Sequence, residues 1–543
     1  MGGSPIAARL AIAVTSSLLD RDVARRARYS QGAGIMRIIP AAVAQPHDLA
    51  MLRATIADAL RVGMSITPRG AGTAMDGGNI GSGLALDLCG FNRGECDIDV
   101  GLRLASVSPS LSLVALRAAA ALHGLRLPPE PSSAAWATLG GMASTNAAGA
   151  RSLRYGSIRP WIVALTLETM DGPLQLERGE KPPAMHPVVR RWEEQVVPML
   201  DRHRDEIVRR YPAVRKNSAG YALDHWLADR ELIDLVIGSE GTLGVITRLT
   251  VRLDTQPSVR MSMRAVLERR DTLESAINAI RSFDPETLEF LDASFLAVLR
   301  GRPSYSATES GLLDAGSILL ADFTGNDADE VSSRIEAAAV AAAPFARIDL
   351  ALQPDQIEKL WAVRHGASPA LAALEDGRRS LQVVEDGCVP AEALVAYIEA
   401  VEAACGSAGV DLVVFGHAGD GHVHVNLLPH VDDPSWPNRV VEVYRRVSAD
   451  VIALGGTPAG EHGAGRLRAP LLSALYGAAV MKCHVAVKNA FDPIGLFNPG
   501  VIIGDTDPFS SLKLGADAPA IPVDVEAWLA DMERRGDWGR SRW

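Results

Sequence analysis

The stretch "TPRGAGTAMDGG", residues 67–78, directly follows the short strand-like run "MSI". A glycine-rich turn after a strand exposes successive backbone N–H groups, which can hold a diphosphate. The stretch is neither a GxGxxG motif nor a Walker loop, because no helical pattern and no Gly-Lys-Ser/Thr follows it. Taken alone, it fits an ordinary glycine-rich connection better than a cofactor site.

Two later segments have a similar character. "PPEPSSAAWATLGGMASTNAAGARSLRYGS", residues 128–157, is dominated by small residues and cannot fill a core by itself. It suits a backbone that lies against a large flat cofactor, and close strand packing is the alternative. "IGSEGTLGVIT", residues 237–247, places glycines at 238, 241 and 244 and predicts a strand–turn–strand.

The overall composition narrows the class of protein. A chain of 543 residues is too long for one ordinary core, so at least two domains are expected. The net charge is −11 and the longest basic run is "ARRAR" at 24–28, so a nucleic-acid partner is not expected. The five cysteines form no CxxC pair, which argues against a zinc ribbon, an iron–sulfur cluster and a disulfide framework. No run approaches the ~20 apolar residues of a membrane span, and residues 1–22 lack a signal-peptide pattern, so we expect a cytoplasmic protein.

Three regimes follow one another along the chain. Residues up to about 35 look helical and polar, residues 36–255 alternate apolar runs with glycine-rich loops, and residues 256–490 alternate strands and helices. The elements expected within them are a helix at Asp48–Val62 with Leu49, Leu52, Ile56 and Leu60 on one face, strands at Trp161–Met170, Leu232–Ile237 and Ile318–Phe323, and helices at Asp327–Ala343 and Pro390–Ala404. A polar tail from about 506 follows, with a helix near Val523–Arg534.

"FGHAGDGHVHVNL", residues 415–427, concentrates histidine in a chain where it is otherwise scarce. Two strands, Leu412–Phe415 and His422–Leu428, flank a glycine-rich turn and predict a hairpin. Because the side-chain period of a strand is two, His422, His424 and Asn426 share one face. Across the hairpin, His417 and His424 could reach one ion, and neutral imidazoles suit Zn, Mn or Fe. Turn residues that only cap or hydrogen-bond are the commoner alternative.

"GEHGAG", residues 460–465, offers a third ligand in Glu461, beside His462. A carboxylate with two imidazoles leaves coordination positions open, as catalytic metal sites require. A metallohydrolase would use this trio equally well, and two unrelated glycine-flanked turns are the remaining alternative.

Together, the segments at 67–78, 128–157 and 237–247 resemble the flavin-binding part of the FAD-linked oxidases, the vanillyl-alcohol-oxidase-like superfamily. "NPG" at 498–500 completes the pattern. The resemblance implies an α+β fold: a two-part FAD-binding domain at 36–255, an α+β substrate (cap) domain at 256–490, and a segment at 491–505 that returns to the flavin domain. An N-terminal helical segment, 1–35, and a tail, 506–543, would lie outside these domains.

The same resemblance implies which residues hold FAD. They are Pro68, Arg69, Gly70, Ala71, Gly72, Thr73, Gly77, Pro131, Ser132, Thr138, Gly140, Gly141, Ser144, Asn146, Gly149, Tyr155, Gly156, Glu240, Gly241, Gly244, Ile246 and Asn498. Covalently flavinylated relatives often carry a histidine in the first loop. Residues 67–78 contain none, so we expect non-covalent FAD. Val501 stands where many relatives have a lysine.

"GHAGDGHVHVN" and "GEHGAG" narrow the resemblance to the D-2-hydroxyacid dehydrogenase branch, which includes D-lactate dehydrogenases, D-2-hydroxyglutarate dehydrogenases and glycolate oxidase flavin subunits. By this resemblance His417, His424 and Glu461 bind a divalent metal, with zinc preferred over manganese or iron. His462 would be the base, Asn426 would contact substrate, and Arg364 in "LWAVRHGAS" would grip the substrate carboxylate. Asn217 and Tyr221 in "RKNSAGYAL" are weaker candidates, and His422 has no implied role.

The implied activity is oxidation of a small D-2-hydroxy acid to the 2-oxo acid, with hydride transfer to flavin N5. The electrons would pass to a quinone, an electron-transfer flavoprotein or a separate iron–sulfur subunit, with peripheral membrane association as an option. Some relatives that act on 2-hydroxyglutarate have a lysine where this chain has Val384. This chain therefore lacks, at that position, a cation that could pair with the second carboxylate of such a substrate. The alternatives are an oxidase of another alcohol or sugar acid, a flavin-free metallohydrolase, and a silent flavoprotein subunit.

Overall fold

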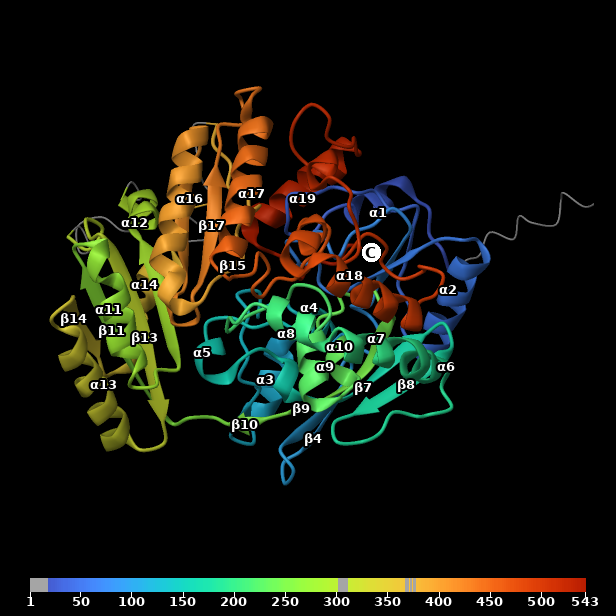
Figure 1. The fold of residues 1–543 in the computed structure, drawn as a ribbon, viewed down its shortest axis with the longest axis horizontal. Helices are drawn as coiled ribbons and strands as arrows, with labels where there is room; N and C mark the ends of the chain where they lie inside the picture. The colour runs from blue at the N-terminus through green and yellow to red at the C-terminus, as the bar shows by residue number, and fades with distance from the viewer. Residues whose placement is uncertain (1–17, 301–310, 367–370, 372–373, 375–376) are drawn as a thin grey trace, which may run out of the picture.

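The computed structural model describes residues 18–300, 311–366, 371, 374 and 377–543. They form two lobes, each with its own hydrophobic core (Figure 1). The first lobe comprises the described residues up to 255 together with helix α18 (Leu472–Phe491) and the segments after it. The second lobe comprises residues 256–454. The seam between the lobes positions the candidate site.

The first lobe contains two main sheets. A parallel sheet has the order β1-β3-β2, and an antiparallel sheet has the order β4-β5-β9-β7-β8. Their bounds are Ala42–Ala44 (β1), Ile66–Arg69 (β2), Leu84–Asp87 (β3), Cys96–Asp99 (β4), Leu104–Val107 (β5), Ile162–Thr169 (β7), Gly172–Glu177 (β8) and Val245–Arg252 (β9), while Leu125–Arg126 (β6) pairs with Asp254–Thr255 (β10). The helices of this lobe are α1 (Val23–Arg28), α2 (Leu49–Arg61), α3 (Leu113–Ala121), α4 (Leu139–Thr145), α5 (Ser152–Tyr155), α6 (Pro187–Arg191), α7 (Val197–Arg202), α8 (Arg204–Arg210), α9 (Leu223–Asp229) and α10 (Ile233–Val236).

Two expectations about local structure in the first lobe are wrong. The expected strand at Leu232–Ile237 is instead the short helix α10 (Ile233–Val236). A short apolar run that is buried on all sides has no periodicity that distinguishes a strand from a helix. The buried face of α2 runs through Leu52, Thr55, Ile56 and Ala59, and Leu60 is exposed. Of the expected helical segment before residue 35, the described part from residue 18 contains only α1.

The second lobe is a seven-stranded antiparallel sheet of order β14-β11-β13-β12-β16-β17-β15. Helices cover both faces: α11, α13, α16 and α17 pack on one, and α12 and α14 on the other. Its strands are β11 (Val259–Leu267), β12 (Thr287–Asp292), β13 (Ser317–Gly325), β14 (Arg347–Ala351), β15 (Gly387–Cys388), β16 (Asp411–His417) and β17 (His422–Leu428), and its helices are α11 (Leu273–Arg281), α12 (Ala293–Arg300), α13 (Ala328–Ala342), α14 (Pro354–His365), α16 (Leu394–Ala408) and α17 (Trp436–Ala453).

Helix α13 shows how the sequence determines these elements. The Asp327 carboxylate caps it by accepting from the backbone N–H groups of Asp329 and Glu330. Val331, Ile335, Ala338 and Ala342 recur at helical spacing and are all buried.

Helix α18 joins the core of the first lobe well before residue 491. Leu475, Val480 and Val487 are buried in that core, so the chain returns to the first lobe at about residue 472. By length and composition alone, Ala469–Phe491 is apolar enough to cross a membrane, and its buried side chains pack in the core of the first lobe.

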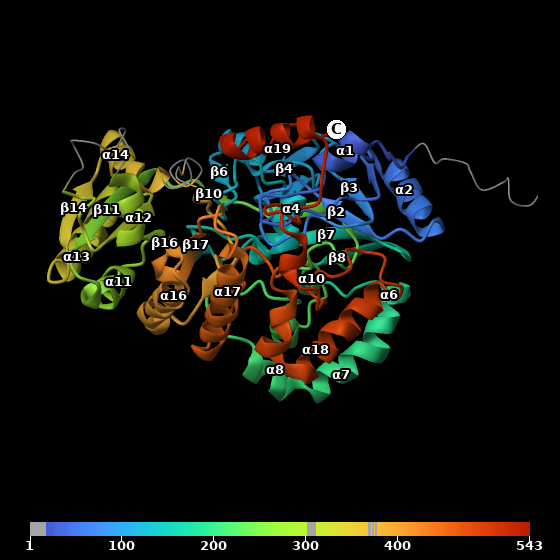
Figure 2. The same ribbon diagram turned by 90° about the horizontal axis from the view of Figure 1, so that it is seen from above.

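The C-terminal tail, residues 506–543, packs against the first lobe through one helix and one arginine. Helix α19 (Val523–Arg535) packs on α1 through Val525, Leu529 and Met532, and the two helices lie on the same side of the molecule (Figure 2). Arg542 then donates from Nη1 to the backbone carbonyls of Arg28 (2.9 Å) and Gln31 (2.8 Å).

Candidate active site

The three glycine-rich segments of the first lobe meet through backbone contacts. A Cβ on Gly70 would lie 2.4 Å from Thr138 Oγ1, so the first loop touches the second only because residue 70 is glycine. The Glu240 N–H donates to the Ser144 carbonyl (2.8 Å), which joins the third segment to the second. Three stretches that are far apart in sequence therefore form one cradle.

Asn498 of the "NPG" segment ties this cradle together. Its Nδ2 donates to the carbonyls of Gly78 (2.7 Å) and Glu240 (2.8 Å), and its Oδ1 accepts from Thr67 Oγ1 (3.2 Å). The side chain is fully buried, so these bonds are shielded from water.

The residues of the cradle fit a long, flat cofactor. Asn146 ends α4 with φ 53°, and its Oδ1 is buried without a partner among the described residues, so it is available to a ligand. The remaining cradle positions expected to hold FAD lie in the same three segments: Pro68, Ala71, Gly72, Thr73 and Gly77 in the first, Pro131, Ser132, Gly140, Gly141, Gly149 and Gly156 in the second, and Gly241, Gly244 and Ile246 in the third.

Three expected cofactor residues have side chains that are already used inside the protein. The Arg69 guanidinium is buried and donates to the carbonyls of Asn79 (3.0 Å) and Gln31 (2.9 Å). The Glu240 carboxylate accepts from the N–H groups of Ala464 and Gly465, and the Tyr155 hydroxyl accepts from Arg126. In this arrangement Arg69 can reach a cofactor only through its main chain.

In the second lobe, the hairpin β16–β17 forms as expected, with Phe415 opposite His424 and His417 opposite His422. Gly421 takes φ 70° in the turn, a conformation that glycine adopts without strain. His417 and His424 are diagonal neighbours, and their ring centroids lie 5.1 Å apart.

The three side chains expected to bind metal converge. His417 Nε2 lies 3.3 Å from His424 Nε2, and each of these atoms lies 3.4 Å from Glu461 Oε1. All three side chains are almost completely buried. The glycines around Glu461 and His462 allow the 460–465 segment to turn toward the hairpin.

Neighbouring groups orient both imidazoles. His424 Nδ1 lies 3.0 Å from the Glu385 carbonyl, which can only accept, so Nδ1 carries the hydrogen. His417 Nδ1 bonds to Glu289, whose carboxyl pKa falls to about 2, since His417 and Arg364 outweigh the effect of burial. Both Nε2 lone pairs therefore face each other and Glu461, and a proton or a cation has to lie between them. Two imidazoles and a carboxylate arranged in this way fit a divalent ion.

His422 is near this trio but is occupied elsewhere. Its Nδ1 accepts from Lys216 Nζ (3.3 Å) and its Nε2 lies 3.0 Å from Asp386 Oδ1. Burial and the lysine charge lower its pKa to about 4, so the ring is neutral. A second group of potential ligands, Glu385, Asp386, His424 and His462, surrounds the buried Arg468, whose guanidinium already pairs with Glu385. A cation is disfavoured there, because Arg468 supplies the positive charge.

His462 lies beside the trio and stacks on the His424 ring at 5.3 Å. Its Nδ1 lies 2.6 Å from Glu385 Oε2, and its Nε2 lies 3.7 Å from Glu461 Oε1. Burial lowers the pKa of this imidazole, but Glu385 and Asp386 outweigh burial and raise it to about 10. In the cation-free protein His462 is therefore protonated at neutral pH.

The two expected substrate contacts approach the same place. Arg364 Nε donates to Glu289 Oε2 (3.1 Å), and Glu289 also holds His417, so Arg364 is linked to the trio through one carboxylate. Asn426 Oδ1 accepts from Ser380 Oγ (3.0 Å) on the histidine face of β17. The weaker candidates are used internally: Asn217 bonds to Tyr476 and Thr457, and Tyr221 bonds to Thr242.

Sequence reasoning missed four charged residues that hold the site: Lys216, Glu289, Glu385 and Asp386. Lys216 Nζ lies 2.8 Å from Glu461 Oε2 and is fully buried. The available signal was local, because "VVED" at 383–386 and "TLEFLD" at 287–292 place acids inside apolar runs, where an acid needs a partner.

Comparisons with known proteins identify the family. Residues 40–175 match the sequence model of the FAD binding domain, and residues 257–502 match that of the C-terminal domain of FAD linked oxidases. The chain is 28% identical to the glycolate oxidase subunit GlcD of Bacillus subtilis over 80% of this chain and 83% of that one. It is 28% identical to a D-lactate dehydrogenase of Archaeoglobus fulgidus, over 85% and 91%. It is also 27% identical to a D-2-hydroxyglutarate dehydrogenase of Pantoea ananatis, but covers only 53% of that longer protein.

Solved structures share the fold. An alkyldihydroxyacetonephosphate synthase superimposes with a TM-score of 0.63 at 15% identity, covering 92% of this chain and 85% of that one. The 4-ethylphenol oxidase of Gulosibacter chungangensis gives the same TM-score at 16% identity, covering 90% and 94%. Because the chain matches both domains of the FAD-linked oxidases, the alternative of a flavin-free metallohydrolase is wrong. The chain belongs to the FAD-linked oxidases and is an FAD-linked oxidoreductase with the vanillyl-alcohol-oxidase type of fold.

Proposed function

We propose that this protein oxidises a D-2-hydroxy acid to the 2-oxo acid, using non-covalent FAD and a divalent cation held by His417, His424 and Glu461. One observation carries the proposal: in an FAD-linked oxidase chain, two imidazole Nε2 atoms and one carboxylate oxygen lie within 3.4 Å of one another. A flavin oxidation that needs no cation would not require this buried set. The names of the relatives, which act on lactate, glycolate or 2-hydroxyglutarate, support the substrate class.

Arg364 would bind the substrate carboxylate. Glu289 fixes the guanidinium through Nε, and the group lies over the Phe415 ring at 4.8 Å, which leaves a planar fork suited to a carboxylate. Asn426, on the same strand face as His424, would hydrogen-bond to the substrate from the other side. These two residues would present the substrate carbon in a single orientation.

His462 would take the proton of the substrate hydroxyl at Nε2, because Glu385 occupies Nδ1. When bound, FAD would accept the hydride and the cation would polarise the hydroxyl. His462 must first lose its own proton, and it does so more readily with a positive charge at Glu461, because like charges lower the pKa of a neighbouring imidazolium. The cation site and the base are therefore interdependent.

Anaerobic bleaching of the flavin tests this function. D- and L-2-hydroxy acids would be added to purified protein with and without Mn²⁺ or Zn²⁺, and flavin absorbance followed. We expect bleaching by a D-2-hydroxy acid that depends on the metal. Bleaching by an unrelated alcohol or sugar acid, with no response to any 2-hydroxy acid, would contradict the proposal.

The electron acceptor and location follow as parts of the same proposal. Electrons would pass to a quinone, an electron-transfer flavoprotein or a separate iron–sulfur subunit, and the protein would work in the cytoplasm with optional attachment to a membrane surface. Reduced enzyme mixed anaerobically with each acceptor class would identify the partner by the rate of flavin reoxidation.

A further inference from the structure

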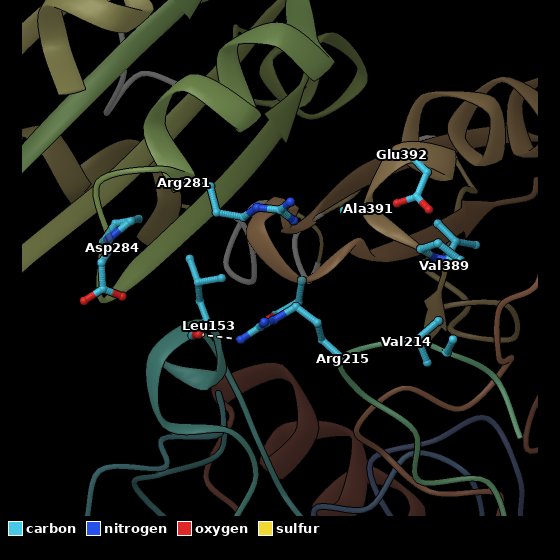
Figure 3. A pocket seen from close by; sticks show the side chains of 12 residues that line it. Leu153, Val214, Arg215, Arg281, Asp284, Val389, Ala391 and Glu392 are labelled. Carbon is cyan, nitrogen blue, oxygen red and sulfur yellow. Dashed lines mark hydrogen bonds and ion pairs between the residues drawn. The ribbon is translucent and has the colours of Figure 1, made fainter. Parts of the chain in front are cut away.

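A cavity that none of His417, His424 and Glu461 lines opens at the seam of the two lobes (Figure 3). Its volume is about 480 Å³, within the range of small-molecule sites. Leu153 and Arg215 line it from the first lobe, and Arg281, Val389, Glu392 and Asp420 line it from the second. A molecule bound here would touch both lobes.

Two arginines carry the free side-chain donors of this cavity, and the exposed Glu392 offers acceptors. Within the part of the chain that the structure describes, the Arg281 guanidinium makes no ion pair and no hydrogen bond. Arg215 uses Nε for Asp420 Oδ1 (2.9 Å) and Nη2 for the Leu153 carbonyl (2.6 Å), which leaves Nη1 available. In Figure 3 the two side chains approach the same space from above and below.

Among the described residues of this cavity, Arg215 is already paired with Asp420, so Arg281 carries the unpaired positive charge. Asp284 pairs with Arg154 (3.0 Å) and Arg334 (3.9 Å). Asp420 is buried and is shared by Arg215, Lys216 and Ser152. Glu392 is exposed, so water screens its charge. The open positions inside the cavity therefore favour a negatively charged ligand.

We infer that this cavity binds a small dicarboxylate, with one carboxylate group on Arg281 and the other on Arg215. A guanidinium only donates, and the free Arg281 can present its planar fork to a carboxylate. Arg215 offers Nη1 alone, because its Nε and Nη2 already bond to Asp420 and Leu153. Leu153, Val389 and Pro390 form an apolar part of the wall, which suits the methylene groups between the two carboxylates of such a ligand. This binding does not depend on the proposed oxidation, because none of the three expected metal ligands lines the cavity.

A chain of ionic contacts connects the cavity to the histidine cluster. Arg215 holds Asp420, Asp420 lies 3.5 Å from Lys216 Nζ, and Lys216 Nζ lies 2.8 Å from Glu461 Oε2. A dicarboxylate competes with Asp420 for Arg215, which leaves Asp420 to attract Lys216 more strongly. Glu461 then loses part of its lysine partner and is more available to a cation. This step, which rests on the proposed metal site, makes the ligand an effector that strengthens metal binding.

Calorimetric titration of the FAD-loaded protein tests the binding. Succinate and glutarate are the probes, the uncharged glutaramide is the matched neutral control, and inorganic phosphate tests for a different anion. We expect a dicarboxylate to bind, with Arg281→Ala weakening it roughly tenfold or more, the loss expected for a charge-assisted hydrogen bond. Arg281→Lys, which keeps the charge and loses the fork, should lie in between.

Two further variants separate this site from others. Arg347→Ala removes a surface arginine of the same lobe and should leave binding unchanged, whereas Arg364→Ala disturbs the proposed substrate site and should also leave cavity binding intact. Loss of binding in Arg364→Ala but not in Arg281→Ala would overturn the inference. Equal binding of glutaramide or of phosphate would overturn the dicarboxylate assignment.

The coupling has its own measurement. Mn²⁺ affinity would be measured with and without saturating succinate, and we expect it to rise several-fold in the wild type and not in Arg281→Ala. If succinate binds but the affinity for Mn²⁺ does not change, the contacts through Asp420 and Lys216 do not couple the cavity to the metal site. If Mn²⁺ does not bind at all, the proposed metal function fails, while the succinate titration still decides whether the cavity is a site.

Discussion

The first lobe builds its cradle from backbone atoms and glycines, whereas the second lobe builds its cluster from buried charged side chains. Gly70 touches Thr138 and Glu240 N–H bonds to Ser144, so the fit of the cradle is steric. His417, His424 and Glu461 are instead held by Glu289, the Glu385 carbonyl and Lys216, so the fit of the cluster is electrostatic. Substitutions that add side-chain volume should therefore disturb the cradle of the first lobe most. Substitutions that remove a charge should disturb the histidine cluster of the second lobe most.

Removal of the cation should have the largest effect. Chelation should abolish flavin reduction by the substrate, and added Mn²⁺ or Zn²⁺ should restore it, because the two Nε2 atoms and Glu461 would be left with only a proton between them. Glu461→Gln should do the same without recovery. Metal content and stopped-flow flavin reduction measure both. Activity that is indifferent to strong chelators would remove the cation from the proposal.

Replacement of His462 should rank next. His462→Ala should slow flavin reduction by roughly 10²–10⁴-fold, the usual contribution of a general base, while FAD stays bound. His123→Ala, which removes an exposed histidine of the first lobe, is the matched control and should reduce flavin at the wild-type rate. An unchanged rate in His462→Ala would assign the proton transfer to another group.

Added volume in the cradle should act on the cofactor and not on the cluster. Gly70→Val places carbon atoms where a Cβ alone already lies 2.4 Å from Thr138 Oγ1, so the loops must separate and FAD should be lost on purification. Gly406→Ala is the control, since nothing lies within 4 Å of the added carbon and alanine favours helix α16. Flavin absorbance per protein measures the effect. A yellow Gly70→Val protein with full flavin content would contradict a steric cradle.

The pH dependence of stability should give the smallest effect. The pKa of His462 is raised to about 10 from its usual 6.5, so in cation-free protein its stabilising contribution is complete below about pH 6.5 and is lost as the pH rises toward 10. Denaturant unfolding of wild type and His462→Gln across pH 6.5–10 checks this. We expect the wild type to lose more stability over that range, and equal slopes would show that Glu385 and Asp386 do not hold the proton.

The sequence predicted the parts of the site whose signals are local. Glycine spacing marked the cradle, and the alternation of His422, His424 and Asn426 gave the correct strand face. The contacts that orient the imidazoles join residues far apart, such as His417 and Glu289 or Lys216 and Glu461, and no local pattern reports them. Periodicity also failed at Ile233–Val236, where every residue is buried and strand and helix look alike.

The tail helps to hold the cradle from a distant part of the chain. Gln31 accepts from both Arg69 and Arg542, so one carbonyl links the start of the cradle to a residue synthesised more than 500 positions later. A Cβ on Gly539 would lie 2.5 Å from the Trp136 ring, so the same tail also presses on the second loop. The cradle therefore depends on contacts from Asn498 and from residues 539–542, all far along the chain. A chain without these residues would lack part of the packing that surrounds the cradle.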